Sequence, residues 1–207
     1  MRFYNRALSP AEAQAVYKLG SDITPPVINP PSDIVAEATG PTGAVVSFTA
    51  TAIDDVDGPV NVTASPPSGS TFSSGVTAVG LAATDTAGNT STGSFTVTVR
   101  DTTPPSITSV TPSIASIWPP NKKMVPVTLN ATATDAVGIA SLKIISVSTN
   151  EPSTDAQWRI TGPLALTLLA DRLGTGRAYT ITVEASDGAG NTSRKTATVA
   201  VPHDQGK

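Results

Sequence analysis

The stretch Thr84-Asp85-Thr86-Ala87-Gly88-Asn89-Thr90-Ser91 returns later in the chain as Ser186-Asp187-Gly188-Ala189-Gly190-Asn191-Thr192-Ser193. Each copy lies between two runs in which apolar and polar residues alternate, which is the pattern of a half-buried strand. Asp, Gly and Asn are favoured in tight turns because they tolerate a left-handed backbone or hydrogen-bond to it. Both copies are therefore predicted to be hairpin turns, in which Asp85 and Asp187 accept hydrogen bonds from turn amides.

A second repeated marker divides the chain. Asp22-Ile23-Thr24-Pro25-Pro26 recurs as Asp101-Thr102-Thr103-Pro104-Pro105, and proline pairs interrupt strand pairing because proline has no N–H to donate. We therefore expect domains at 22–103 and 104–207, each of roughly the 100 residues of an immunoglobulin-like sandwich. The predicted fold class is all-β: two tandem immunoglobulin-like β-sandwiches, preceded by an orphan strand and a short helix.

Alternating runs place the predicted strands. In the first domain one unbroken strand is expected through 46–52, followed by strands that begin near Val60 and Val79 and a last one through 95–99. In the second domain strands are expected at 125–133, 142–147, 164–169 and 179–185. Because the second domain is the longer one, its additional residues are best placed around 151–177.

Composition excludes several classes of function. The net charge is −3 and the pI about 5.0, whereas nucleic-acid binding needs clustered Lys and Arg; Lys122-Lys123 is the densest basic spot. Cysteine is absent, which excludes disulfides, thiol catalysis and cysteine metal sites. No apolar stretch approaches the roughly 18 residues of a membrane span.

Residues 1–21 differ from the rest. Ser9-Pro10-Ala11-Glu12 is a capping box with proline at the first helical position, which predicts a helix over 10–19 that Gly20 ends. With the strand-like start Arg2-Phe3-Tyr4-Asn5-Arg6, this segment resembles the C-terminal end of a laminin-G-like (concanavalin-type) jelly roll; an unrelated N-terminal helix is the alternative. Met1 opens directly into that strand, so we interpret the start as a truncation.

Residues 22–103 resemble the hyalin repeat (HYR) family. The resemblance rests on Asp22–Ile28, on Ala38–Phe48, on Pro66–Phe72 and on Ala83–Thr90. It implies an immunoglobulin-like extracellular module associated with adhesion. The family commonly carries a cysteine pair, and the aligned positions here are Ala64 and Leu81. We expect these two to face each other across the first core, close enough for a cysteine pair to span them.

Residues 104–207 resemble a bacterial immunoglobulin-like module. The resemblance rests on Trp118–Val125, on Ser148–Pro152, on Arg177–Ile181 and on the ending Val201–Gly206. It implies no particular function. The positions where the resemblance places cysteines are Val137, Leu142 and Ala185.

Calcium is the cofactor for which the sequence offers ligands. Asp54, Asp55 and Asp57 lie on one loop and could coordinate the ion, which takes six to eight oxygens; the alternative is a plain turn, because the loop ends in Asp57-Gly58. Trp118 and Trp158 could form a carbohydrate platform or pack at the edges of their domain. Catalytic residues are not predicted: His203 and Asp204 are neighbours, and in an extended segment they point to opposite faces.

These observations predict a non-catalytic part of a larger surface or secreted protein. Its role would be adhesion and spacing, as an elongated extracellular monomer with a protein or glycan ligand. The alternative is an accessory region of a secreted polysaccharide-acting enzyme or a carbohydrate-binding protein. An inert spacer would differ from the adhesive one only in binding no ligand.

Overall fold

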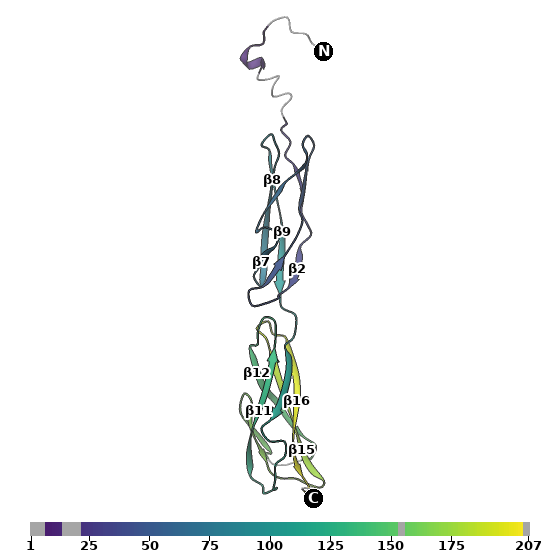
Figure 1. Cartoon of the computed structure of the whole chain (residues 1–207), viewed down its shortest axis with the longest axis vertical. Coiled ribbons are helices and arrows are strands. Elements are labelled where there is room, and N and C mark those ends of the chain that lie inside the picture. The colour runs from purple at the N-terminus through teal and green to yellow at the C-terminus, as the bar shows by residue number, and fades with distance from the viewer. Residues whose placement is uncertain (1–6, 14–21, 153–155, 205–207) are drawn as a thin grey trace. The chain divides into compact units, whose positions relative to one another are not determined.

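A computed structural model of the chain describes residues 7–13, 22–152 and 156–204. Within these residues the fold is all-β, apart from one helical turn at 10–13. The chain divides into two compact units, each described by itself (Figure 1). The first comprises 1–36 and 44–99, and the second comprises 37–43 and 100–207.

The first unit is built from short strands that end in one long hairpin. Its strands are β1 (Val27–Asn29), β2 (Ile34–Glu37), β3 (Ala44–Val46), β4 (Thr51–Asp54), β5 (Gly58–Val60), β6 (Val62–Ser65), β7 (Ser70–Phe72), β8 (Gly75–Thr84) and β9 (Thr90–Arg100). One sheet has the order β2-β9-β8-β6, and two smaller ones the orders β1-β4-β5 and β3-β7. The expected hairpin over 85–89 is confirmed, because β8 pairs with β9 from Thr84 opposite Thr90 to Gly75 opposite Val99.

The core of the first unit follows the predicted alternation. Phe95, Val97 and Val99 of β9 are buried while Arg100 is exposed. Val79 and Leu81, two positions apart on β8, are also buried and lie on one face of that strand. Gly88 of the turn has φ of +92°, a backbone conformation that residues other than glycine and asparagine rarely adopt.

One expected strand is interrupted. The run 46–52 forms β3 and β4 with unpaired residues between them, so the prediction of one continuous strand is wrong. Phe48 lies in this gap, and the hydroxyl of Ser68 both accepts from its N–H and donates to its carbonyl at 2.8 Å. A side chain thus provides the backbone hydrogen bonds that a neighbouring strand would otherwise form. Hydrophobic periodicity does not predict such a replacement.

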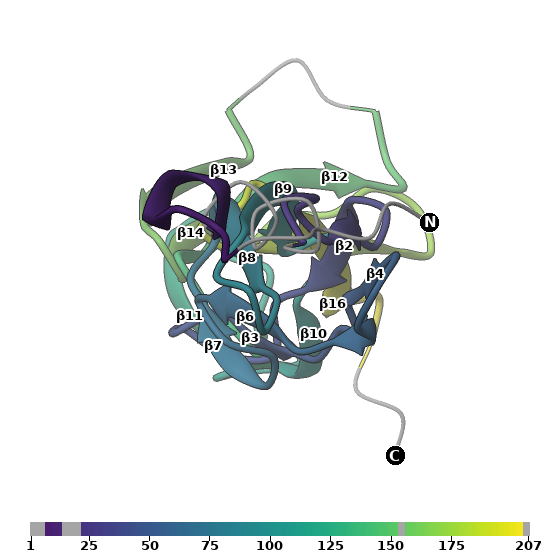
Figure 2. The same cartoon turned by 90° about the horizontal axis from the view of Figure 1, so that it is seen from above.

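The second unit has the strand order of a constant-type immunoglobulin domain. Its strands are β10 (Ser106–Pro112), β11 (Met124–Thr134), β12 (Ser141–Thr149), β13 (Trp158–Gly162), β14 (Ala165–Leu169), β15 (Gly176–Ser186) and β16 (Thr192–Pro202). The sheets β10-β11-β14-β13 and β12-β15-β16 correspond to ABED and CFG. In Figure 2 the first set lies along one side of this unit, with β12 and β16 on the other.

The predicted insertion around 151–177 contributes the β13–β14 hairpin, which completes the four-stranded sheet. Tyr179 of β15, in the other sheet, forms a hydrogen bond to this four-stranded sheet. Its side chain is fully buried, and its hydroxyl donates to the carbonyl of Leu169 at 2.9 Å. A tyrosine near the start of strand F that bonds the backbone upstream is a feature of immunoglobulin-like sandwiches.

The positions at which cysteines were expected lie beside each other in single sheets. Ala64 of β6 is directly opposite Leu81 of β8, and Leu142 of β12 is opposite Ala185 of β15. The expectation that Ala64 and Leu81 face each other across the core is wrong, because neighbouring strands of one sheet carry them. Val137 lies outside the strands, in the turn after β11.

The capping box is confirmed, whereas most of the helix expected over 10–19 lies outside the described residues. The Ser9 backbone N–H donates to Oε2 of Glu12 at 2.9 Å, and the Glu12 N–H donates to the Ser9 hydroxyl at 3.3 Å. The strand expected before Ala7 also lies outside the described residues. Among the residues that are described, no helix is long and apolar enough to cross a membrane.

Candidate metal centre

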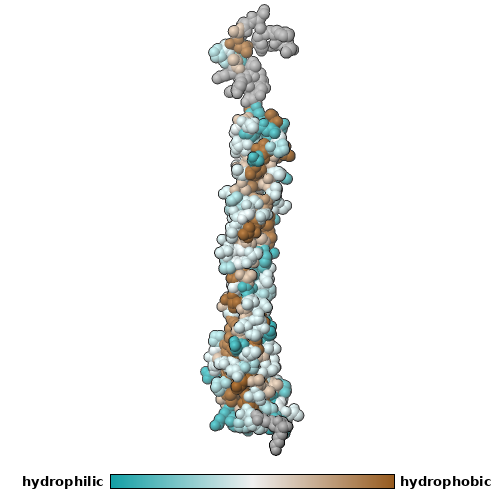
Figure 3. All heavy atoms as spheres, viewed as in Figure 1, coloured by the Kyte–Doolittle hydropathy of each residue, from teal (hydrophilic) through white to brown (hydrophobic). Residues whose placement is uncertain are grey.

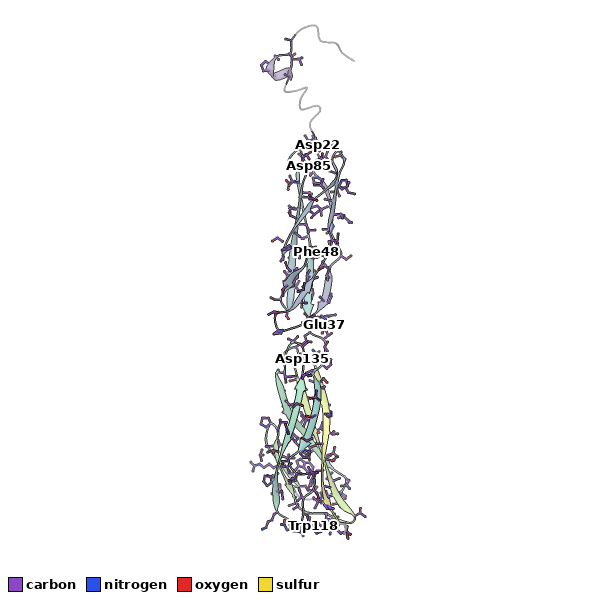
Figure 4. The ribbon with its side chains drawn as sticks, in the orientation of Figure 1. Asp22, Glu37, Phe48, Asp85, Trp118 and Asp135 are labelled. Atoms are coloured by element: carbon purple, nitrogen blue, oxygen red, sulfur yellow. The ribbon has the colours of Figure 1, made fainter. Side chains whose placement is uncertain are left out.

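Three aspartates from distant parts of the chain meet at one end of the first unit. Asp22 precedes β1, Asp54 ends β4, and Asp85 begins the turn between β8 and β9. One carboxylate oxygen from each lies within 4.8 Å of the other two. Figure 4 shows Asp22 and Asp85 close together at this end. Asp54 and Asp85 are buried, with exposed fractions of 3% and 7%.

Backbone amides fix each carboxylate of this cluster. Asp22 Oδ1 accepts from the Thr24 N–H, and Asp54 Oδ1 accepts from the N–H groups of Val56 and Asp57. Asp85 Oδ1 accepts from the Asn89 N–H at 2.7 Å, as the sequence predicted. The Asn89 amide then donates to Asp85 Oδ2 and to the Asp22 carbonyl, which ties the start of the unit to the hairpin turn.

The second unit repeats this arrangement with Asp101, Asp135 and Asp187. The bonds recur atom for atom. Asp101 Oδ1 accepts from Thr103, Asp135 Oδ1 accepts from Val137 and Gly138, and Asp187 Oδ1 accepts from Asn191. The Asn191 amide donates to Asp187 Oδ2 and to the Asp101 carbonyl. Asp135 is labelled at one end of this unit in Figure 4.

The pKa shifts of three cluster carboxylates differ in direction. Burial acts to raise the pKa of Asp85, but hydrogen bonds from Asn89 and the turn amides outweigh it and hold that pKa below its usual value. The pKa of Asp187 is lowered in the same way by Asn191. The pKa of Asp101 is raised, first by burial and then by the negative charges of Asp187, Asp135 and Glu37.

Several oxygens of the clusters have no hydrogen-bond partner. Asp22 Oδ2, Asp54 Oδ2 and Asp101 Oδ2 are buried and accept no hydrogen bond. None of the ion pairs found in the described part of the chain involves these six aspartates. The clusters therefore concentrate negative charge and buried acceptors, the features that a hard cation requires.

Of the loop residues that the sequence singled out, only Asp54 belongs to a cluster. Among the described residues, the groups of three close carboxylates do not include Asp55 or Asp57. Asp55 is exposed, and the Asp57 carboxylate accepts from the N–H and the hydroxyl of Thr86. A calcium site formed by Asp54, Asp55 and Asp57 remains a prediction. Sequence reasoning missed Asp22, Asp101 and Asp135, although the first two begin the repeated proline markers.

The remaining candidates are His203, Asp204 and the two tryptophans. His203 Nδ1 and Asp204 Oδ2 approach to 3.6 Å, so the expectation that they point to opposite faces is wrong; the chain bends there after β16. Both side chains are exposed. Trp158 packs against the core from the edge strand β13, edge to face with Tyr179, whereas 42% of Trp118 is exposed.

Solved structures to which the chain is similar include titin domains Z1Z2 in complex with telethonin and human protocadherin-24 EC1-2. The titin structure shares 17% identity, covers 86% of this chain and 95% of that one, and has a TM-score of 0.38. The protocadherin structure shares 16% identity, covers 88% of this chain and 100% of that one, and has a TM-score of 0.37.

Sequence comparison supports the resemblance of the first unit. Hyalin of Lytechinus variegatus is 40% identical over 98 residues, which are 45% of this chain and 18% of that protein. The chain therefore spans less than a fifth of the relative it matches. The HYR domain family matches residues 21–99. The match runs from the residue before Asp22 to Val99 of β9, so residues 21–99 are similar to the HYR domain, whereas residues 1–20 lie outside the match.

Proposed function

We propose that the chain is a non-catalytic adhesion and spacing segment of a larger extracellular or cell-surface protein. The observation that carries this proposal is the HYR domain match over the first unit. The second unit adds an immunoglobulin-like sandwich with its own core, which fits a tandem of independent modules. The only histidine of the chain, His203, is exposed and pairs with Asp204 in the exposed segment after β16.

The surface agrees with this role. On the face drawn in Figure 3, apolar residues form small separate patches among weakly polar ones. The exposed apolar side chains of the first unit come from many different strands and turns, among them Val27, Val45, Ile53 and Val76. Such a surface fits a module that contacts a protein or glycan ligand through a limited area.

Small-angle scattering tests the spacing role. The connection at 101–105 contains Pro104-Pro105, which favours the extended polyproline conformation and resists collapse. A compact globule of this length would have a radius of gyration of about 17 Å. We expect a value above about 22 Å for two modules held end to end as a monomer, and a value near that of the globule would contradict the spacer.

The alternative function is an accessory carbohydrate-binding region, and the exposure of Trp118 favours it. An exposed indole can stack on the apolar face of a sugar ring. If that function were correct, retention of the chain on insoluble cellulose or chitin would be lost on Trp118→Ala and kept on Ile160→Ala, which changes another exposed apolar side chain of the same unit. We expect no retention by the unsubstituted chain, and retention that depends on Trp118 would replace the adhesion proposal.

A further inference from the structure

We propose that Asp22, Asp54 and Asp85 form a calcium site in the first unit, and that Asp101, Asp135 and Asp187 form the equivalent site in the second. This inference concerns cation binding and holds whether or not the chain is adhesive. It differs from the loop site of Asp54, Asp55 and Asp57, because two of its three ligands come from other segments.

The main evidence for the first site is the environment of the Asp54 carboxylate. The Asp54 side chain is 3% exposed and its Oδ1 accepts two turn amides, while its Oδ2 has no partner. A buried charged oxygen without a partner is costly. The other two carboxylates of the cluster, those of Asp22 and Asp85, add like charge and so increase that cost. A bound cation removes both penalties at once.

Holding the turns does not explain the arrangement. The turn amides use Oδ1 of Asp22 and Oδ1 of Asp54 and leave both Oδ2 atoms buried and without partners. An asparagine could hold either turn through its own side-chain oxygen without bringing in a negative charge. Both units nevertheless place three aspartates at the three positions, and Asp101 Oδ2 is left without a partner in the same way.

The ligand chemistry favours calcium. Every ligand offered is an oxygen, whereas zinc in proteins prefers imidazole or thiolate. Two oxygens bound to one calcium at about 2.4 Å are at most about 4.8 Å apart, and the carboxylate oxygens of each cluster lie within 4.8 Å of one another. Magnesium demands a regular octahedron at shorter distances. Water would complete the coordination shell of calcium.

Calcium binding to the full chain, first stripped with a chelator, is measured by isothermal titration calorimetry. We expect two sites per chain, with Kd on the order of 10⁻⁴–10⁻³ M, the range of calcium sites in extracellular modules. Calcium at about ten times Kd should raise the melting temperature by about 5–10 °C. Magnesium at the same concentration should raise it less. Absence of binding at about 10 mM calcium overturns the proposal.

Single substitutions assign the sites. Asp54→Asn should abolish one site and Asp135→Asn the other. Asp55→Asn is the matched control, because it removes the same charge from an exposed position on the same turn, and it should keep both sites. An Asp55→Asn protein that loses a site, or an Asp54→Asn protein that keeps both, overturns the proposal.

The melting temperature measured without calcium shows whether Asp54 is a calcium ligand or only stabilises the turn. Asparagine in place of Asp54 would keep an oxygen for the turn amides and remove like charge from the cluster. The Asp54→Asn protein in chelator should therefore melt at the same temperature as the unsubstituted chain or higher. An equal loss of stability with and without calcium would show a purely structural role and overturn the proposal. Asp22→Asn, at a partly exposed position, gives the same readout if Asp54→Asn does not fold.

Discussion

Glu151→Gln is expected to lower the free energy of unfolding of the second unit by about 3–5 kcal/mol, the usual cost of removing one partner from a buried ion pair. Arg177 Nε lies 3.1 Å from Glu151 Oε2, and the two side chains are 2% and 10% exposed. The same Glu151 oxygen accepts from the Leu173 N–H at 2.7 Å. Glutamine keeps an oxygen for that amide but leaves the guanidinium charge without its counterion.

The surroundings of Arg177 explain the size of this effect. Burial acts to lower the pKa of Arg177, but the hydroxyl of Tyr179 and the carboxylate of Glu151 outweigh it and raise that pKa. Arginine therefore stays charged in the folded unit and cannot relieve the loss by releasing a proton. The Tyr179 hydroxyl, 3.2 Å from Arg177 Nη1, and the face of its ring would be the remaining partners.

Glu184→Gln is the matched control. Glu184 pairs with Arg194 at 2.9 Å, but 64% of the Arg194 side chain is exposed. Exposed pairs contribute about 0–1 kcal/mol because water screens both charges. Denaturant unfolding, with hydrogen exchange of β15 and β16 amides to follow the second unit, compares the two variants. Equal losses would mean that Glu151 and Arg177 are solvated in solution.

The hairpins could be predicted from sequence because their signals are local. Each repeated turn combines Asp, Gly and Asn at fixed positions between alternating strands, and both form as expected. The interruption between β3 and β4 could not be predicted in this way. It depends on Ser68, which is distant in sequence and takes the place of a strand beside Phe48.

The burial of Arg177 could have been predicted from the alternation of apolar and polar residues in its strand. Arg177 lies on the same face of β15 as Tyr179 and Ile181, both fully buried, so alternation alone places an arginine in the core. Its counterion could not be found in this way, because Glu151 is 26 positions away in the chain and the β13–β14 hairpin lies between the two residues.

The acidic clusters show the same limit. Sequence reasoning grouped Asp54 with Asp55 and Asp57, which are neighbours in the chain, whereas the fold groups it with Asp22 and Asp85. The available signal was repetition. Asp22 and Asp101 begin the repeated proline markers, Asp85 and Asp187 begin the repeated turns, and Asp54 and Asp135 each precede a valine by two positions. Residues that recur together across two units are candidates for one shared site.

Phe95→Ala is expected to destabilise the first unit by about 3–5 kcal/mol, the usual cost of truncating a buried phenylalanine. Phe95 is 5% exposed, lies opposite Val79 of β8, and packs edge to face on Phe48 with 4.8 Å between ring centroids. Such a loss is large against the roughly 5–15 kcal/mol that holds a domain folded.

The composition of this core makes Phe95 hard to replace. Apart from Phe72 and Phe95, the buried apolar residues of β3 to β9 are Ala, Val and one Leu. The chain has no cysteine to cross-link the unit, and both tryptophans lie in the second unit. Val76→Ala, at a β8 position that is 71% exposed, should change stability by no more than about 0.5 kcal/mol. Hydrogen exchange of the β8 and β9 amides measures the stability of the first unit in both variants. Similar protection in the two variants would show that small side chains close the cavity. The aromatic pair would then be dispensable.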